Sequence, residues 1–210
     1  MTATLAKAYR FLKRQGRALA QCRFPIVWVV TDTKRMANPE RVVSTLPRGT
    51  GVILRHYDMP KRAALAQRLA HICRARGLTF LVGGDWQLAA RVNADGVHLG
   101  DGAARSGFAA GGRLWRRGKA ARLLTVSAHG ARGLQRGKQL GASAALLGSV
   151  FKTASHPRRG FLGTLQTAAM IRAARLPVLA LGGITTANIK MLHGIGVAGI
   201  AGIGFATTGK

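Results

Sequence analysis

Short apolar runs recur along the chain from residue 26 onward, and longer segments of helix-forming composition separate them. The runs are rich in valine, isoleucine, leucine and alanine, and glycine, proline or polar residues bound them, which is typical of buried β-strands. They predict eight strands, at Ile26–Thr31, Gly51–Arg55, Thr79–Val82, Gly96–Leu99, Leu123–Ser127, Ala144–Val150, Pro177–Leu181 and Gly199–Ile203.

The segments between these runs are rich in alanine, leucine, arginine and lysine, which favour helices. Alternation of such segments with strands this apolar predicts a parallel sheet covered by helices. No GxGxxG motif opens the first unit, so a closed (β/α)8 barrel, the TIM-barrel fold, is favoured over an open doubly wound sheet. Helices are expected at Pro60–Arg76, Ala131–Leu140, Thr164–Arg175 and Thr185–Gly194, with a short one at Asp85–Val92.

The first 24 residues differ from the rest, because they carry six basic groups and no acid. Leu5, Tyr9 and Leu12 follow helical spacing. We therefore divide the chain into a basic N-terminal helical extension, residues 1–24, and a TIM-barrel catalytic domain, residues 25–210. Transit peptides and membrane-surface helices share this composition, but we favour a helix that covers one end of the barrel.

Charge is the unusual bulk property, since 33 lysines and arginines stand against six acids. Such a field attracts phosphates, nucleic acids and acidic surfaces without selecting among them. The basic residues are spread along the chain without interleaved aromatics, so polyanion binding should be nonspecific. No apolar stretch approaches about 18 residues, and no secretory signal begins the chain. We expect a cytoplasmic protein with no membrane partner, whereas the sequence leaves homo-oligomer formation open.

Polar and glycine-rich motifs follow several predicted strands, at the end of the barrel where this fold binds ligands. Gly182-Gly183 follow the seventh strand, where close backbone N–H groups and the start of a helix favour a phosphate. Ser127 and His129 lie two residues apart and should face the same side. After the sixth strand come hydroxyls and cations suited to a diphosphate or carboxylate, namely Lys152, Thr153, Ser155, His156 and Arg158.

The two strand-end histidines receive different interpretations. His129 lies beside the Ser127 hydroxyl, so we expect it to act as a general acid or base or to bind a phosphate. His98 belongs to the fourth predicted strand, where packing at the barrel mouth is its default role and substrate contact is the alternative.

The order of these motifs resembles the thiamine phosphate synthase/TenI family over roughly Ile26 to Phe205. Single motifs are weak, but five of them in the right order are specific. These five are Thr31-Asp32 after the first strand, Gly-Val-His-Leu-Gly at Gly96 to Gly100, Ser-x-His at Ser127 and His129, the segment Val150 to His156, and Gly-Gly-Ile at Gly182 to Ile184. In the second strand the family has Gln-x-Arg followed two positions on by Lys, and this chain keeps Arg55 but has Ile53 and Tyr57 at the flanking positions.

The chain departs from the family at the magnesium ligands. The resemblance implies one Asp from an Asn-Asp pair after the third strand and another shortly after His-Leu-Gly, but Gly83-Gly84 and Ala103 stand at these positions. Mg²⁺ requires carboxylates in octahedral geometry, and Asp85 and Asp101 are the nearby acids that a register shift could bring in. Mg²⁺ is therefore possible, with the family's own ligands missing.

Three functions remain open. As a synthase, a transferase of thiamine biosynthesis, the chain would join hydroxymethylpyrimidine diphosphate to thiazole phosphate and release diphosphate, which Arg55, Thr153, Ser155 and His156 would clamp. As a TenI-like tautomerase it would need no metal, and His129 would move a proton on thiazole carboxylate phosphate. The third function is a non-catalytic barrel that binds anionic partners. The missing aspartates favour the tautomerase, whereas the Thr-x-Ser segment favours the synthase, which we take as the working hypothesis.

Overall fold

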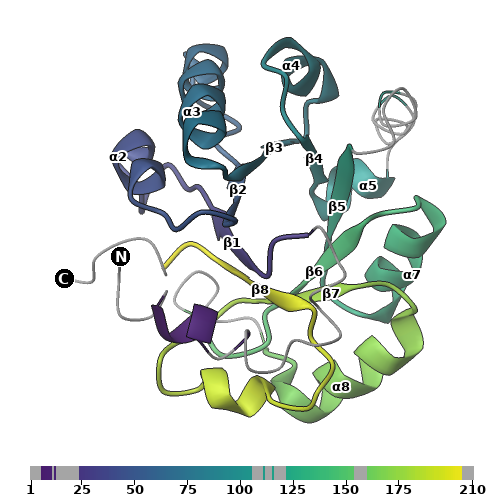
Figure 1. The fold of residues 1–210 in the computed structure, drawn as a ribbon. Coiled ribbons are helices and arrows are strands. Elements are labelled where there is room, and N and C mark those ends of the chain that lie inside the picture. The colour runs from purple at the N-terminus through teal and green to yellow at the C-terminus, as the bar shows by residue number, and fades with distance from the viewer. Residues whose placement is uncertain are drawn as a thin grey trace.

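A closed barrel of eight parallel strands forms the centre of the protein (Figure 1). This computed structural model describes residues 6–10, 12, 24–105, 111, 115, 122–153 and 160–204. Each strand pairs with its sequence neighbours, and β1 closes the barrel against β8 through Val27 opposite Ile200. The predicted TIM barrel is confirmed, and every strand end lies within two residues of its expected place. The strands are β1 Val27–Val30, β2 Gly51–Leu54, β3 Thr79–Gly83, β4 Gly96–Leu99, β5 Leu123–Ala128, β6 Ala144–Gly148, β7 Val178–Leu181 and β8 Gly199–Gly202.

Two apolar clusters sit on the two faces of the strands. The inner cluster includes Trp28, Ile53 and Leu146, and the larger outer cluster packs between the strands and the helices. Successive residues of a strand alternate between these faces, so on β5 Leu124 and Val126 join the outer cluster. Because Ser127 follows Val126, it points inward, at the end of the strand where the cavity described below opens.

Helices surround the barrel as a ring in Figure 1. They are α2 Pro39–Ser44, α3 Arg62–Arg76, α4 Trp86–Arg91, α5 Asp101–Arg105, α7 Ala131–Gln139 and α8 Gly163–Ala174. The expected α-helix at Thr185–Gly194 is wrong, because only a 3₁₀ turn at Ile189–Leu192 forms there. Thr185 and Asn188 bond to each other's backbone N–H through their side chains, and such bonds compete with an α-helix.

The N-terminal extension contains a helix, since residues 6–10 and 12 are helical. Ala8 and Leu12 are fully buried in the outer cluster. The Tyr9 hydroxyl lies 2.6 Å from the Thr50 hydroxyl just before β2, and Lys7 Nζ donates to the Thr186 carbonyl after β7. Because these contacts reach both ends of strands, the described part of the helix lies along the flank of the barrel, whereas a helix over one end was expected.

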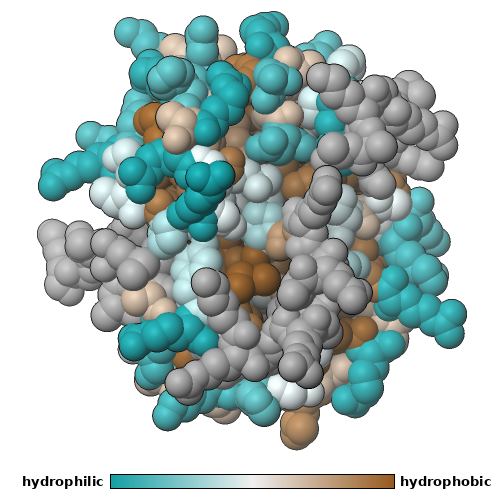
Figure 2. Space-filling view, viewed as in Figure 1, coloured by the Kyte–Doolittle hydropathy of each residue, from teal (hydrophilic) through white to brown (hydrophobic). Residues whose placement is uncertain are grey.

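Hydrophilic residues cover much of the outer helices in Figure 2, and hydrophobic residues reach the surface toward the middle of the same face. Within the described part of the chain, no helix is both long and apolar enough to span a membrane.

Candidate functional site

A cavity of about 700 Å³ opens at the carboxyl ends of the strands. Its wall comes from residues that end or follow β1, β2, and β4 to β8, the position at which barrels of this kind bind ligands. Six of the nine predicted site residues line it: Arg55, Ser127, His129, Thr153, Gly182 and Gly183. Ser155 and His156 lie outside the described residues, and His98 does not reach the wall.

Main chain forms the β7–β8 side of the cavity. Gly182 and Gly183 have φ angles of 91° and 68°, which L side chains rarely adopt. A Cβ atom on Gly183 would meet the carbonyl oxygens of Lys152 and of Phe151, the latter at 2.6 Å. The loop after β6 therefore packs directly on this glycine, and no larger residue fits between them.

The predicted anion site at this side would rest on a turn, because a 3₁₀ turn and no α-helix lies between β7 and β8. Within the described part of the chain, the amides of Gly183 and Ile184 donate to no acceptor. Gly202 at the end of β8 and Gly204 just after it line the neighbouring wall with backbone atoms, between the side chains of Ala201 and Ile203. Successive amides in a glycine turn can form a concave anion site. The predicted phosphate site therefore has backbone N–H donors, but it has no helix dipole to add to them.

Ser127 and His129 both line the cavity, as expected from their spacing. His129 Nδ1 lies 2.8 Å from the carbonyl oxygen of Gly148. Since a carbonyl only accepts, Nδ1 carries the hydrogen when the ring is neutral, which leaves Nε2 as an acceptor. Nε2 has no partner in the described residues, so it can take a proton from a ligand or bind one of its donors.

His98 lies inside the barrel, beneath Ser127. Its Nδ1 lies 2.9 Å from the Thr125 hydroxyl and its Nε2 lies 3.0 Å from the Ser127 hydroxyl. Burial, with a smaller contribution from the charge of Arg55, lowers the pKa of His98 to about 3. The ring is therefore neutral near pH 7, and both of its nitrogens are engaged. This geometry holds the Ser127 hydroxyl in place and keeps His98 itself away from the cavity.

The β1–β2 side of the cavity carries an ion-pair network. Asp32 Oδ2 lies 3.3 Å from Arg55 and 3.4 Å from Arg35, and Asp32 also caps the turn that follows it. Burial alone would raise the pKa of Asp32, but the hydrogen bonds and charge of Arg35, together with the charge of Arg55, lower it. The backbone N–H of Arg55 donates to the Thr31 hydroxyl. These contacts hold Arg55 on the cavity wall with Asp32 charged.

Tyr57 and Arg62 occupy the β2–β4 side, where the sequence places the departures from the family. Tyr57 lines the cavity, and the Arg62 guanidinium lies 5.5 Å from the centre of its ring. Arg62 donates to the Gly83 carbonyl and lies 3.5 Å from Asp85. Sequence reasoning noted Tyr57 only as a departure and missed Arg62. Arg62 lies in the first turn of α3, where the helix dipole disfavours a positive charge. That unfavourable position was the feature of the sequence that could have drawn attention to it.

The described residues do not fit the magnesium site of the family. Both carboxylate oxygens of Asp101 are in ion pairs, with Arg136 at 2.7 Å and Arg105 at 2.9 Å. Asp85 caps α4 through the N–H of Leu88 and does not line the cavity. No group of three histidine, cysteine or acidic side chains able to hold a metal ion occurs in the described ranges. Neither acid that a register shift would bring in is therefore available as a free carboxylate.

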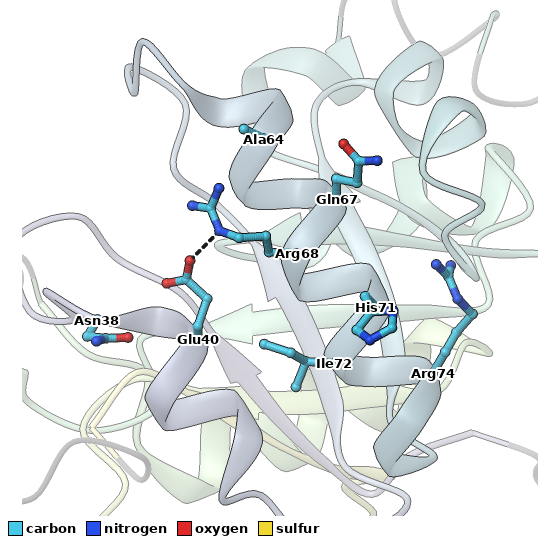
Figure 3. Close-up of a pocket in the computed structure, with 8 residues that line it drawn as sticks. All are labelled: Asn38, Glu40, Ala64, Gln67, Arg68, His71, Ile72 and Arg74. Atoms are coloured by element: carbon cyan, nitrogen blue, oxygen red, sulfur yellow. Dashed lines mark hydrogen bonds and ion pairs between the residues drawn. The ribbon is translucent and has the colours of Figure 1, made fainter.

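A second hollow, of about 860 Å³, lies on the outer side of the barrel between α2 and α3. Figure 3 shows its residues, among them Glu40 paired with Arg68 at 2.7 Å. Except for Asn38 and Glu40, they all come from α3. No predicted site residue reaches this hollow, so we assign the chemistry to the strand ends.

Comparison with known proteins places this geometry in context. Residues 27–205 match the family described as thiamine monophosphate synthase. A thiamine-phosphate synthase of Roseiflexus castenholzii is 34% identical over 185 residues, which are 84% of this chain and 78% of that protein. A putative thiamine-phosphate synthase 2 of Aquifex aeolicus is 29% identical, and the match covers 85% of this chain and 96% of that protein.

Solved structures share the fold. Thiamine phosphate pyrophosphorylase from Pyrococcus furiosus superimposes with a TM-score of 0.66 at 21% identity, covering 85% of each chain. A 3-keto-L-gulonate-6-phosphate decarboxylase from Vibrio cholerae gives a TM-score of 0.63 at 14% identity, covering 88% of this chain and 91% of that one. At these sequence identities, the structural similarity establishes the barrel fold only, and the reaction has to be argued from the residues of the cavity.

Proposed function

Because the chain belongs to the thiamine monophosphate synthase family, we propose that it joins hydroxymethylpyrimidine diphosphate to thiazole phosphate. In this reaction the methylene carbon of the pyrimidine loses its bond to a diphosphate oxygen and gains a bond to the thiazole ring nitrogen. The diphosphate leaves with the bonding electron pair. A site for this reaction must bind two anionic groups and stabilise the charge that develops on the leaving one.

The convergence of two kinds of anion-binding group on one cavity carries this proposal. Gly182 and Gly183 offer backbone amides, while Arg55 and Lys152 offer positive side chains. A cavity of about 700 Å³ is in the size range of small-molecule sites. Two phosphorylated heterocycles therefore have separate places for their charged ends within one space.

Each group has a role in this proposal. The glycine turn after β7 holds the thiazole phosphate, and Arg55, Lys152 and Thr153 hold the diphosphate through charge-assisted hydrogen bonds. Ser127, oriented by His98, and His129 contact the heterocycles. Ser155 and His156 remain predicted members of the diphosphate clamp. The family generally uses Mg²⁺, but we route no step through the ion because the described residues do not fit its site.

Calorimetric titration of each substrate tests the proposal. Wild-type protein should bind both thiazole phosphate and the pyrimidine diphosphate, each at one site per chain. Arg55→Gln should weaken pyrimidine diphosphate binding by about tenfold, because it removes a charged hydrogen-bond donor, and should leave thiazole phosphate binding nearly unchanged. Absence of binding by both ligands would contradict the proposal.

The TenI-like tautomerase is the second candidate, and the poor fit to magnesium specifically favours it. That reaction moves a proton on thiazole carboxylate phosphate, and Nε2 of His129 is the acceptor in the cavity without a described partner. Following the two isomers by NMR separates the candidates. Isomer exchange without thiamine phosphate formation would identify a tautomerase, and thiamine phosphate formation would identify a synthase.

A further inference from the structure

The Tyr57 ring lies against Gly83 and Gly84, the positions at which the resemblance places the family's Asn-Asp pair. A Cβ atom on Gly83 would lie 3.1 Å from the Tyr57 hydroxyl and 2.7 Å from the Leu54 carbonyl oxygen. On Gly84 a Cβ atom would lie 3.2 Å from the ring, and on Gly100 it would lie 3.9 Å from the hydroxyl. Side chains on Gly83 and Gly84 would therefore have to displace the tyrosine ring, so an Asn-Asp pair after β3 would compete with Tyr57 for the same space.

The Tyr57 hydroxyl is available to a ligand. It lies beside the ends of β3 and β4 on the cavity wall, and it hydrogen-bonds to none of the described residues. Burial raises the pKa of this phenol, against smaller opposing contributions from Arg55 and Arg62. The group therefore keeps its proton at neutral pH and can donate to an anion.

Arg62 places a fixed positive charge behind this hydroxyl. Its side chain is only 14% exposed, and its Nε has no hydrogen-bond partner. Among the described residues, the acid that pairs with it is Asp85, which lies at 3.5 Å and also caps α4. Apart from this acid, Arg62 bonds to the neutral Gly83 carbonyl. Because the charge of Asp85 is shared with the end of α4, the guanidinium leaves positive potential behind Tyr57, where a low dielectric strengthens its effect.

We propose that Tyr57 and Arg62 replace the divalent cation at this wall, so that the chain binds a diphosphate group without metal. Tyr57 donates a hydrogen bond to a diphosphate oxygen. Arg62, which lies behind the Tyr57 ring and not in the cavity itself, stabilises the negative charge of the diphosphate electrostatically. Tyr57 is thus a ligand-binding residue, whereas Arg62 is a positioning and electrostatic residue. The inference rests on the proposed function for the identity of the ligand, but it concerns diphosphate binding and not catalysis.

Calorimetric titration with inorganic diphosphate, in EDTA and then in millimolar Mg²⁺, tests this inference on the full chain. The wild type should bind with nearly the same affinity in both buffers. Tyr57→Phe, which keeps the ring, should weaken binding in EDTA by about tenfold, the usual effect of losing a hydrogen bond to a charged group. Arg62→Gln should weaken it several-fold, and Arg62→Lys should restore part of the loss.

Arg68→Gln is the matched control, because Arg68 lies on the same helix and pairs with Glu40 away from the cavity. It should bind diphosphate as the wild type does, and thermal unfolding identifies any variant that fails to fold. Binding that requires Mg²⁺, or a Tyr57→Phe protein that binds like the wild type, would overturn the inference. Diphosphate binding that occurs only with Mg²⁺, from protein that still forms thiamine phosphate, would overturn it while supporting the proposed function. Diphosphate binding without metal, from protein that forms no thiamine phosphate, would support the inference and contradict the proposed function.

Discussion

The two sides of the cavity differ in what they keep of the family pattern. On the β5–β8 side, Ser127, His129 and Gly182-Gly183 match the family motifs, and the conformation of the glycine turn is set by its backbone. On the β2–β4 side, Tyr57 and Gly83-Gly84 replace charged or amide side chains. The β5–β8 side depends on positive φ angles and close backbone contacts, which few residues other than glycine satisfy. The β2–β4 side depends on side chains, so substitutions there can replace one set of charged groups by another. This difference makes the variants below unequal in their effects.

The largest effect should come from Gly183→Ala. The new Cβ would collide with the carbonyl oxygens of Phe151 and Lys152 at a positive φ angle, so the β6 and β7 loops must move apart. We expect thiazole phosphate binding to be lost and the free energy of unfolding to fall by about 2 kcal/mol. Calorimetry and urea unfolding measure the two effects.

Gly160→Ala provides the control for that variant. Gly160 has open space around its Cα and no positive φ angle, so this change should leave ligand binding intact. Equal losses in both variants would mean that the glycine turn has no special part in binding.

A smaller effect on turnover is expected from His129→Asn. The asparagine amide can still donate to the Gly148 carbonyl, but it offers nothing in place of Nε2. Turnover should fall on the order of 100-fold if Nε2 transfers a proton, while thiazole phosphate affinity changes little. Steady-state kinetics separates the two quantities. A parallel fall in affinity would make His129 a binding residue instead.

Acid pH should weaken the fold through His98. Its pKa of about 3 in the folded state lies below the value near 6.5 of an unfolded histidine. Between these values the unfolded chain binds a proton that the folded chain does not, so stability falls as pH falls. The contribution is roughly 1.4 kcal/mol per pH unit and is fully present above about pH 6.5. Urea unfolding from pH 7 to pH 5 measures the slope.

His98→Asn should flatten that slope, although its absolute stability will be lower. His56, whose pKa burial also lowers, remains in both proteins, so the difference between slopes reports His98. Equal slopes would show that His98 does not remain neutral inside the barrel.

The strands were predictable because their signal is local. Runs such as those of β1 and β6 are apolar on both faces, and only a buried parallel sheet accommodates them. Ser127, His129 and the glycine pair could be placed at the barrel mouth for the same reason, and all of them line the cavity, although their roles remain predictions. The helix after β7 was wrong because the Thr185 and Asn188 side chains compete for the backbone.

Contacts between distant segments were beyond a reading of one sequence. Arg62 belongs to a helical pattern, and only the fold brings it to Tyr57 and Asp85. The role of His98 depends on hydroxyls from the adjacent strand, Thr125 and Ser127. The composition of the first 24 residues predicted a helix there. Its position on the flank of the barrel could not be predicted, because it depends on contacts with the distant residues Thr50 and Thr186.

The central claim is that one cavity joins the two phosphorylated heterocycles. Its most direct test is incubation of the protein with hydroxymethylpyrimidine diphosphate and thiazole phosphate, with thiamine phosphate and released diphosphate measured by mass spectrometry. The account predicts that both products form in equal amounts and that Gly183→Ala abolishes them. Thiamine phosphate that never appears, from protein that binds both substrates, would contradict the claim.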